Sequence, residues 1–188
     1  MVVAPGAQAP VPLAQIEAIL HGIADPEIPV VSIHELGILR AFAWVLDAAG
    51  QPLLEVVLTP TYSACPAVAQ IQQDIETALA RLGVACIVKL QLAPAWSSDW
   101  ITAPAREKLR AWGVAPPEPS QPQVIRFARP APKSGQDRER ARPVPDRVHC
   151  PQCGSADTTE TSYFGSTACK AMYRCLNCLE PFDYFKPH

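Results

Sequence analysis

The chain lacks the features that would assign it to several common classes of protein. None of its apolar runs approaches the roughly 18 residues that a membrane-spanning helix needs, and residues 1–15 lack the basic and apolar segments of an export signal. It has no Glu-x-x-His pair of the kind that holds a di-iron centre, and no glycine-rich nucleotide loop. The formal net charge of −2 and the pI near 6.1 provide no overall attraction for nucleic acid or an anionic membrane. We therefore expect a cytoplasmic protein that binds neither nucleic acid nor membranes.

The composition is that of a folded protein with one unusual segment. At 188 residues, with 48% hydrophobic and 18% charged residues, the chain is long enough for one ordinary domain and a smaller appendage. Its 21 prolines are about twice the average share of roughly 5%. The seven cysteines, in a chain without an export signal, favour metal binding or thiol chemistry over structural disulfides.

The first two thirds of the chain have the hydrophobic pattern of a small mixed domain. Helical apolar spacing and stretches rich in β-forming residues predict five elements in the order α-β-β-α-β, with boundaries at residues 11–23, 38–46, 53–59, 66–82 and 85–92. The second helix joins two strands that this order makes parallel, so we expect an α/β (α+β) sandwich. A short helix near residues 104–112 closes this domain, which we assign to residues 11–114.

The composition changes abruptly after this domain. Residues 115–147 are dense in proline and charge and have almost no periodic apolar positions, which predicts an extended linker. Residues 148–188 then form a second, small domain, held away from the first unless it docks specifically.

The second domain contains the clearest motif in the chain. Two Cys-x-x-Cys knuckles flank residues 154–174, a spacing close to that of tetrahedral four-thiolate sites, and their cysteines are Cys150, Cys153, Cys175 and Cys178. So short a segment cannot bury enough apolar surface to fold unaided, so metal binding should supply most of its folding free energy. We predict a zinc ribbon with one Zn²⁺. Iron also suits four thiolates, and reduced cysteines without metal are the simpler alternative.

Two further features of the sequence allow more than one interpretation. Cys169 is a fifth cysteine in the second domain and is expected to pack as a small apolar residue, with an alternative ligand or a reactive thiol as the other interpretations. Trp96 and Trp100 follow the last strand of the first domain and form either part of its core or an interface.

Residues 59–66 lead from a predicted strand into a predicted helix and place Cys65 directly before Pro66. Proline is common at the first helical position, so Cys65 should lie at or beside the N-cap. The free amides and the dipole of a helix N-terminus stabilise an anion, and the hydroxyls of Thr59 and its neighbours can donate hydrogen bonds. We therefore predict that the thiol pKa of Cys65 lies below the ordinary value of about 8.5. Such a thiolate is a nucleophile or a metal ligand, whereas a purely structural cysteine in a tight turn is the alternative.

Asp25 begins an Asp-Pro-Glu sequence whose simplest role is to cap a helix. Together with residues 26–38 and 59–66, however, it resembles the small domain of SufT-type and cytosolic iron-sulfur assembly factors. Further blocks narrow the resemblance to the PaaD family, the accessory subunits of bacterial phenylacetyl-CoA epoxidase; these blocks are residues 95–101, 106–109, 164–171 and 180–185. Cys65 and Asp25 match the motif cysteine and aspartate, whereas Ala64 stands where glycine is expected.

The resemblance implies an accessory protein, not an enzyme, that acts in phenylacetate degradation and helps to mature the metal centres of the epoxidase. It implies that Cys65, with Asp25 and Thr59, transiently carries iron or an iron-sulfur cluster, and that the partners are the oxygenase and reductase subunits. A structural adaptor that bridges these subunits without metal transfer is the main alternative. A homodimer of this chain is a further possible assembly. Nucleic-acid binding by the ribbon is a weaker alternative, because acidic residues outnumber Lys and Arg in residues 148–188.

Overall fold

The first domain has the predicted order of elements. The computed structural model describes residues 11–63, 65–118 and 148–187, and within these ranges no helix has the length and apolar character needed to cross a membrane. The elements before the ribbon are α1 Leu13–His21, β1 Leu39–Leu46, β2 Pro52–Leu58, α2 Ala67–Ala80, β3 Cys86–Leu90, the 3-10 helix η1 Ser98–Trp100 and α3 Ala103–Trp112.

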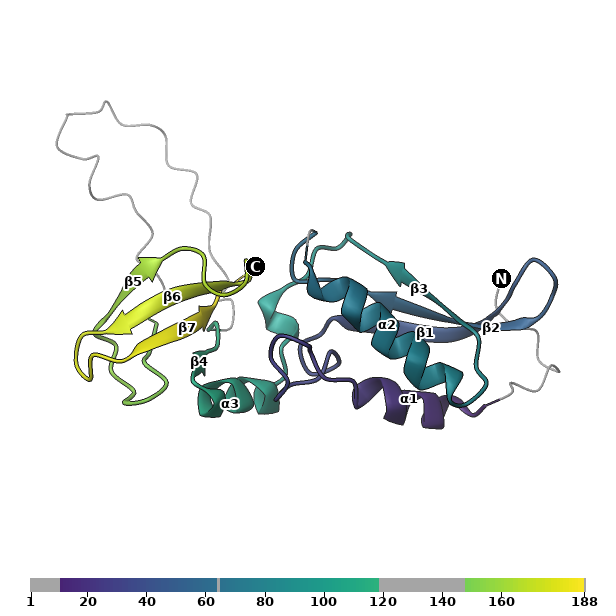
Figure 1. The fold of residues 1–188 in the computed structure, drawn as a ribbon, viewed down its shortest axis with the longest axis horizontal. Coiled ribbons are helices and arrows are strands. Elements are labelled where there is room, and N and C mark those ends of the chain that lie inside the picture. Colours follow the sequence, from purple (N-terminus) through teal and green to yellow (C-terminus); the bar gives the residue numbers. More distant parts are fainter. Residues whose placement is uncertain (1–10, 64, 119–147, 188) are drawn as a thin grey trace, which may run out of the picture.

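The sheet of this domain has the order β1-β2-β3. β1 and β2 form an antiparallel hairpin, and β3 pairs with β2 in parallel after the crossover through α2, which confirms the predicted α/β (α+β) arrangement. Figure 1 shows α1 and α2 lying along the sheet. The core forms between them because each element presents apolar side chains at its own period, including Ile16 and Leu20 of α1, Leu54 and Val56 of β2, and Ile71 and Ile75 of α2.

The ribbon is a four-stranded sheet with the order β4-β7-β6-β5. Its strands are β4 Val114–Ala115, β5 Thr158–Ser162, β6 Lys170–Cys175 and β7 Pro181–Phe185. β4 leaves α3 and pairs in parallel with β7, with Val114 opposite Asp183. The expected linker therefore began too early, since Ala115 already belongs to the ribbon sheet and to its hydrophobic cluster. Residues 119–147, which make up most of that expected linker, lie outside the described residues.

The ribbon packs against the first domain rather than standing apart from it. Phe185 of β7 and Cys169, which precedes β6, are buried in the hydrophobic cluster of the first domain. The Phe185 ring lies 5.8 Å from the Trp96 ring, measured between centroids. Trp96 is therefore a core residue at the junction, with its indole N–H donating to the Leu36 carbonyl at 3.0 Å.

Gly37 lies where the chain passes close to Trp100, and its replacement by alanine should be costly. Its φ is +72°, and an added Cβ would lie 2.5 Å from the Trp100 Cβ. Gly83 has a similar φ of +68° but no atom within 4 Å of such a Cβ. Gly83→Ala should thus cost about 1–2 kcal/mol for the left-handed backbone, and Gly37→Ala about 1–3 kcal/mol more for overpacking. Urea unfolding of both variants measures the difference, and equal losses would show that Trp100 moves aside freely.

Candidate functional site

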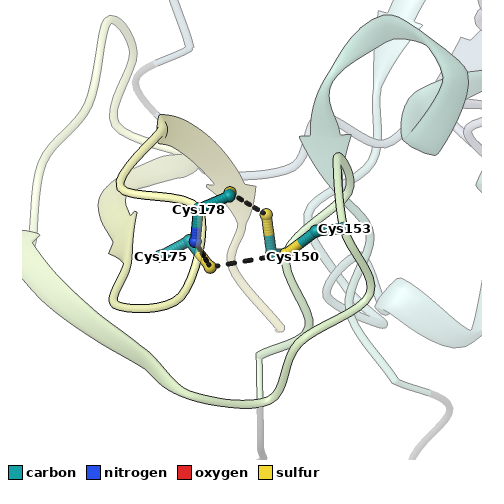
Figure 2. Close-up of side chains that lie close together, drawn as sticks. All are labelled: Cys150, Cys153, Cys175 and Cys178. Carbon is teal, nitrogen blue, oxygen red and sulfur yellow. Dashed lines mark hydrogen bonds between the residues drawn. The ribbon is translucent and has the colours of Figure 1, made fainter.

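The four knuckle cysteines converge on one point (Figure 2). Their sulfur atoms all lie within 4.8 Å of one another, with 3.7 Å between Cys150 and Cys178 and 3.6 Å between Cys153 and Cys175. Two turns bring them together. Cys150 and Cys153 belong to a turn that Gly154 closes at a φ of +72°, whereas Cys175 ends β6 and Cys178 follows in the turn before β7.

This geometry fits a tetrahedral metal ion. A zinc-sulfur distance of about 2.3 Å gives tetrahedral sulfur-sulfur edges of about 3.8 Å, close to those observed, whereas a disulfide would need about 2.05 Å. The Cys178 amide donates to the Cys175 sulfur at 3.4 Å, and this hydrogen bond is the main cause that lowers the pKa of the Cys175 thiol. The ribbon therefore has a donor set suited to binding a metal through thiolates.

Cys169 does not belong to this group of sulfurs. Its side chain is 5% exposed, and its sulfur lies 3.0 Å from the Thr167 hydroxyl. Burial raises the pKa of the Cys169 thiol, and the nearby Glu27 carboxylate raises it further. Cys169 is thus packed, as expected, but at the junction with the first domain rather than inside the ribbon.

Cys65 lies immediately before Pro66, which is the N-cap of α2. Because α2 begins at Ala67, the predicted start of this helix was one residue early. Its half-buried side chain packs against the core of the first domain. The prediction of a lowered thiol pKa is wrong, because burial raises the pKa of Cys65 and the Glu27 and Asp25 carboxylates add to the rise. The helix N-terminus does lower the pKa of Cys65 as expected, through a hydrogen bond from the Ala67 amide. This decrease is smaller than the increase caused by burial of the thiol away from solvent.

Asp25 and Thr59 occupy buried positions. Asp25 Oδ1 accepts hydrogen bonds from the amides of Glu27 and Ile28, both at 2.9 Å, so it caps a turn and not the helix that its sequence suggested. Burial raises the pKa of its carboxyl group. The Thr59 hydroxyl is buried and has no hydrogen-bond partner within the described part of the chain.

Two residues near Cys65 were not predicted as site residues. Thr61, rather than Thr59, hydrogen-bonds the Cys65 thiol, and the Glu27 carboxylate raises the pKa of this thiol more than the Asp25 carboxylate does. Glu27 belongs to the same Asp-Pro-Glu motif as Asp25, which is the signal that could have identified it. Ala64, the departure from the motif, lies outside the described residues.

The raised pKa of Cys65 has a direct experimental consequence. Alkylation of Cys65 by iodoacetamide, followed by peptide mass spectrometry against pH, should give a midpoint above that of a free cysteine. Glu27→Gln should lower the midpoint because it removes a negative charge that disfavours the thiolate. Cys86, which is also partly buried and has its pKa raised by burial, is the internal reference and should not respond to Glu27→Gln. A Cys65 midpoint below that of free cysteine would contradict this assignment.

Two family models match different parts of this chain. Residues 13–90 match the family described as iron-sulfur cluster assembly protein, and residues 134–186 match the PaaD zinc beta ribbon domain. Two solved structures are also similar. A domain of unknown function DUF59 from Bacillus anthracis is 25% identical, with 51% of this chain and 89% of that chain covered and a TM-score of 0.43. A conserved hypothetical protein from Thermotoga maritima is 26% identical, with 53% and 94% covered and a TM-score of 0.42.

One curated relative covers both domains. It comes from Escherichia coli strain K12, is described as a subunit of 1,2-phenylacetyl-CoA epoxidase, and is 41% identical over 184 residues. The alignment covers 95% of this chain and 94% of the relative. The chain therefore belongs to the PaaD family of phenylacetyl-CoA epoxidase subunits.

Proposed function

We propose that this protein is a non-catalytic, cytoplasmic maturation subunit of the phenylacetyl-CoA epoxidase system, in which Cys65 transiently holds iron or an iron-sulfur cluster. Its partners in this proposal are the oxygenase and reductase components. The family supports the metabolic context, and the match of residues 13–90 to an iron-sulfur cluster assembly protein supports the chemistry. The observation that carries the proposal is the placement of the half-buried Cys65 thiol beside the Asp25 and Glu27 carboxylates at the start of α2.

A raised thiol pKa is compatible with such a carrier. Cys65 is protonated at neutral pH while the site is empty, and iron binding displaces the proton. The neighbouring carboxylates disfavour a bare thiolate but attract the cation that replaces the proton. Binding is then coupled to proton release, so an iron-loaded Cys65 site should empty more readily as the pH falls.

In the same proposal, the ribbon holds one structural Zn²⁺ through Cys150, Cys153, Cys175 and Cys178. Four thiolates with no open position are typical of structural zinc, whereas iron in this site would add redox chemistry that the proposed role does not need. The match of residues 134–186 to a zinc ribbon domain supports this choice of metal.

The test of the carrier role is Cys65→Ser, expressed with the oxygenase and reductase under anaerobic conditions. We expect at least one of these components to lose most of its iron, and epoxidase activity to fall in proportion. Cys86→Ser, the same change at another partly buried free cysteine, is the matched control and should leave client iron unchanged.

A structural adaptor is the second candidate, favoured by the packing of Cys65 against the hydrophobic core. A fully active, iron-loaded oxygenase obtained with Cys65→Ser would exclude the carrier role. Loss of the contact between oxygenase and reductase on deletion of the whole chain would then support the adaptor.

A further inference from the structure

The loop between β5 and β6 carries two aromatic side chains on its outer surface. Tyr163 is 61% exposed and Phe164 is 62% exposed. Their rings meet edge to face, with 5.1 Å between the centroids and an angle of 86° between the planes. Single exposed apolar residues are ordinary on a protein surface. Two large rings that contact each other and stay open to solvent instead form a small apolar patch, which we call the aromatic pair.

Hydrogen bonds to the ribbon sheet hold the loop that carries this pair. The Ser162 hydroxyl donates to the Phe164 carbonyl at 2.8 Å, and the Gly165 amide donates to the Lys170 carbonyl at 2.8 Å. Gly165 lies so close to the sheet that an added Cβ would be 3.1 Å from Asp183 Oδ1 and 3.3 Å from the Lys170 Cβ. The aromatic pair is therefore presented by a constrained backbone, which loses little conformational entropy when a partner covers it.

A buried lysine lies against both rings. Lys186 directly follows β7 and is 7% exposed. Its Nζ lies 4.1 Å from the centroid of the Tyr163 ring and 4.6 Å from that of the Phe164 ring, and it donates to the Tyr163 carbonyl at 3.0 Å. Cation-π attraction stabilises the ammonium group in this position, but the two rings do not neutralise its charge.

The neighbouring buried lysine shows what Lys186 lacks. Lys170 is 6% exposed and has the Asp183 carboxylate beside it, with 3.5 Å between Nζ and Oδ2. Within the part of the chain that the structure describes, no carboxylate lies at ion-pair distance from Lys186. A buried charge needs an opposite charge nearby. A partner that covers the aromatic pair also removes the remaining solvent from Lys186, so it should bring a negative group to the ammonium.

We propose that Tyr163, Phe164 and Lys186 form a docking surface for the client component, which covers the two rings with apolar side chains and places a carboxylate beside the Lys186 ammonium. The inference rests on the proposed function, in which the client is the oxygenase or reductase component that receives iron. The β5–β6 loop continues to Cys169, which is buried in the hydrophobic cluster of the first domain. A client bound to the aromatic pair therefore lies near the junction of the two domains.

The test measures binding of the full, zinc-loaded chain to the purified oxygenase and reductase components, each by biolayer interferometry. Phe164→Ala and Lys186→Met should each weaken binding at least tenfold, and Lys186→Met should also reduce the dependence of the affinity on salt. Trp112→Ala removes an aromatic ring that is 57% exposed on α3, and Lys89→Met removes a lysine of β3. Both are matched controls and should leave the affinity unchanged. Zinc content and the circular dichroism spectrum show that each variant is folded.

A second measurement does not depend on the folding of a lysine variant. Replacement of the exposed Phe164 by the photoreactive analogue p-benzoylphenylalanine should give a cross-link to the client, and mass spectrometry should find Asp or Glu in or beside the cross-linked peptide. A change of that acidic residue to lysine should weaken binding of wild type much more than binding of Lys186→Met.

The outcomes separate docking from iron transfer. Cys65→Ser should bind the client with wild-type affinity, because Cys65 is not part of the docking surface. Equal affinities of wild type, Phe164→Ala and Lys186→Met would overturn this inference and leave the carrier role standing, as would a cross-linked peptide without a nearby acidic residue. If wild type binds neither component, both the inference and the partners of the proposed function fail.

Discussion

Replacement of Cys175 by serine should unfold the ribbon and release its metal. The Cys175 side chain is fully buried at the end of β6. Its sulfur lies 3.6 Å from the Cys153 sulfur and accepts a hydrogen bond from the Cys178 amide. Structural zinc contributes about 10–16 kcal/mol to the folding of such modules, and the small ribbon core cannot replace that contribution. Metal analysis should show loss of the zinc, and amide hydrogen exchange should show loss of protection in β5, β6 and β7.

The same variant tests the division into two domains. We expect the first domain to stay folded but to lose stability, because Phe185 and Cys169 leave its hydrophobic cluster when the ribbon unfolds. Cys86→Ser is the matched control, since it also replaces a thiol by a hydroxyl group, but in β3, and should leave the metal in place. Stoichiometric metal retained by Cys175→Ser would refute the ligand assignment. Complete loss of protection in α2 and β2 would refute the independence of the first domain.

The sequence was most informative where structure depends on local periodicity. The stripe of Ile71, Ile75 and Leu79 predicted α2, because a helix repeats its apolar positions at fixed intervals. Two stretches rich in β-forming residues, separated by a polar loop, predicted the β1–β2 hairpin. The Cys-x-x-Cys spacing likewise predicted the four converging sulfurs, because a two-residue spacer limits how far apart the two sulfurs of one knuckle can be.

Features that depend on contacts between distant segments were missed. β4 has only two residues, so it shows no alternation, and its pairing with β7 exists only once the ribbon has docked. The pKa of Cys65 was predicted from the helix N-terminus alone, whereas burial and the Glu27 carboxylate decide its direction. Both errors have the same origin, because desolvation and long-range charge are properties of the packed molecule and not of a sequence window.

Trp96→Ala should destabilise the first domain by about 3–5 kcal/mol, the usual cost of removing a buried tryptophan. Trp96 is 4% exposed, its indole N–H donates to Leu36 at 3.0 Å, and its ring contacts Phe185 of the ribbon. The substitution therefore leaves a cavity and an unpaired carbonyl at the domain junction. Guanidinium or urea unfolding of the metal-loaded chain measures the loss. Trp112→Ala, at a position 57% exposed on α3, is the matched control and should change stability by less than about 0.5 kcal/mol.

A double-mutant cycle separates the ribbon's contribution to the stability that Trp96→Ala removes. In the Cys175→Ser background Phe185 no longer packs on Trp96, so Trp96→Ala should cost less in that chain than in wild type. Equal costs in the two backgrounds would show that the ring contact between Trp96 and Phe185 contributes nothing to docking. A Trp96→Ala chain of unchanged stability that no longer binds the oxygenase would instead place Trp96 in an external interface and contradict its assignment to the core.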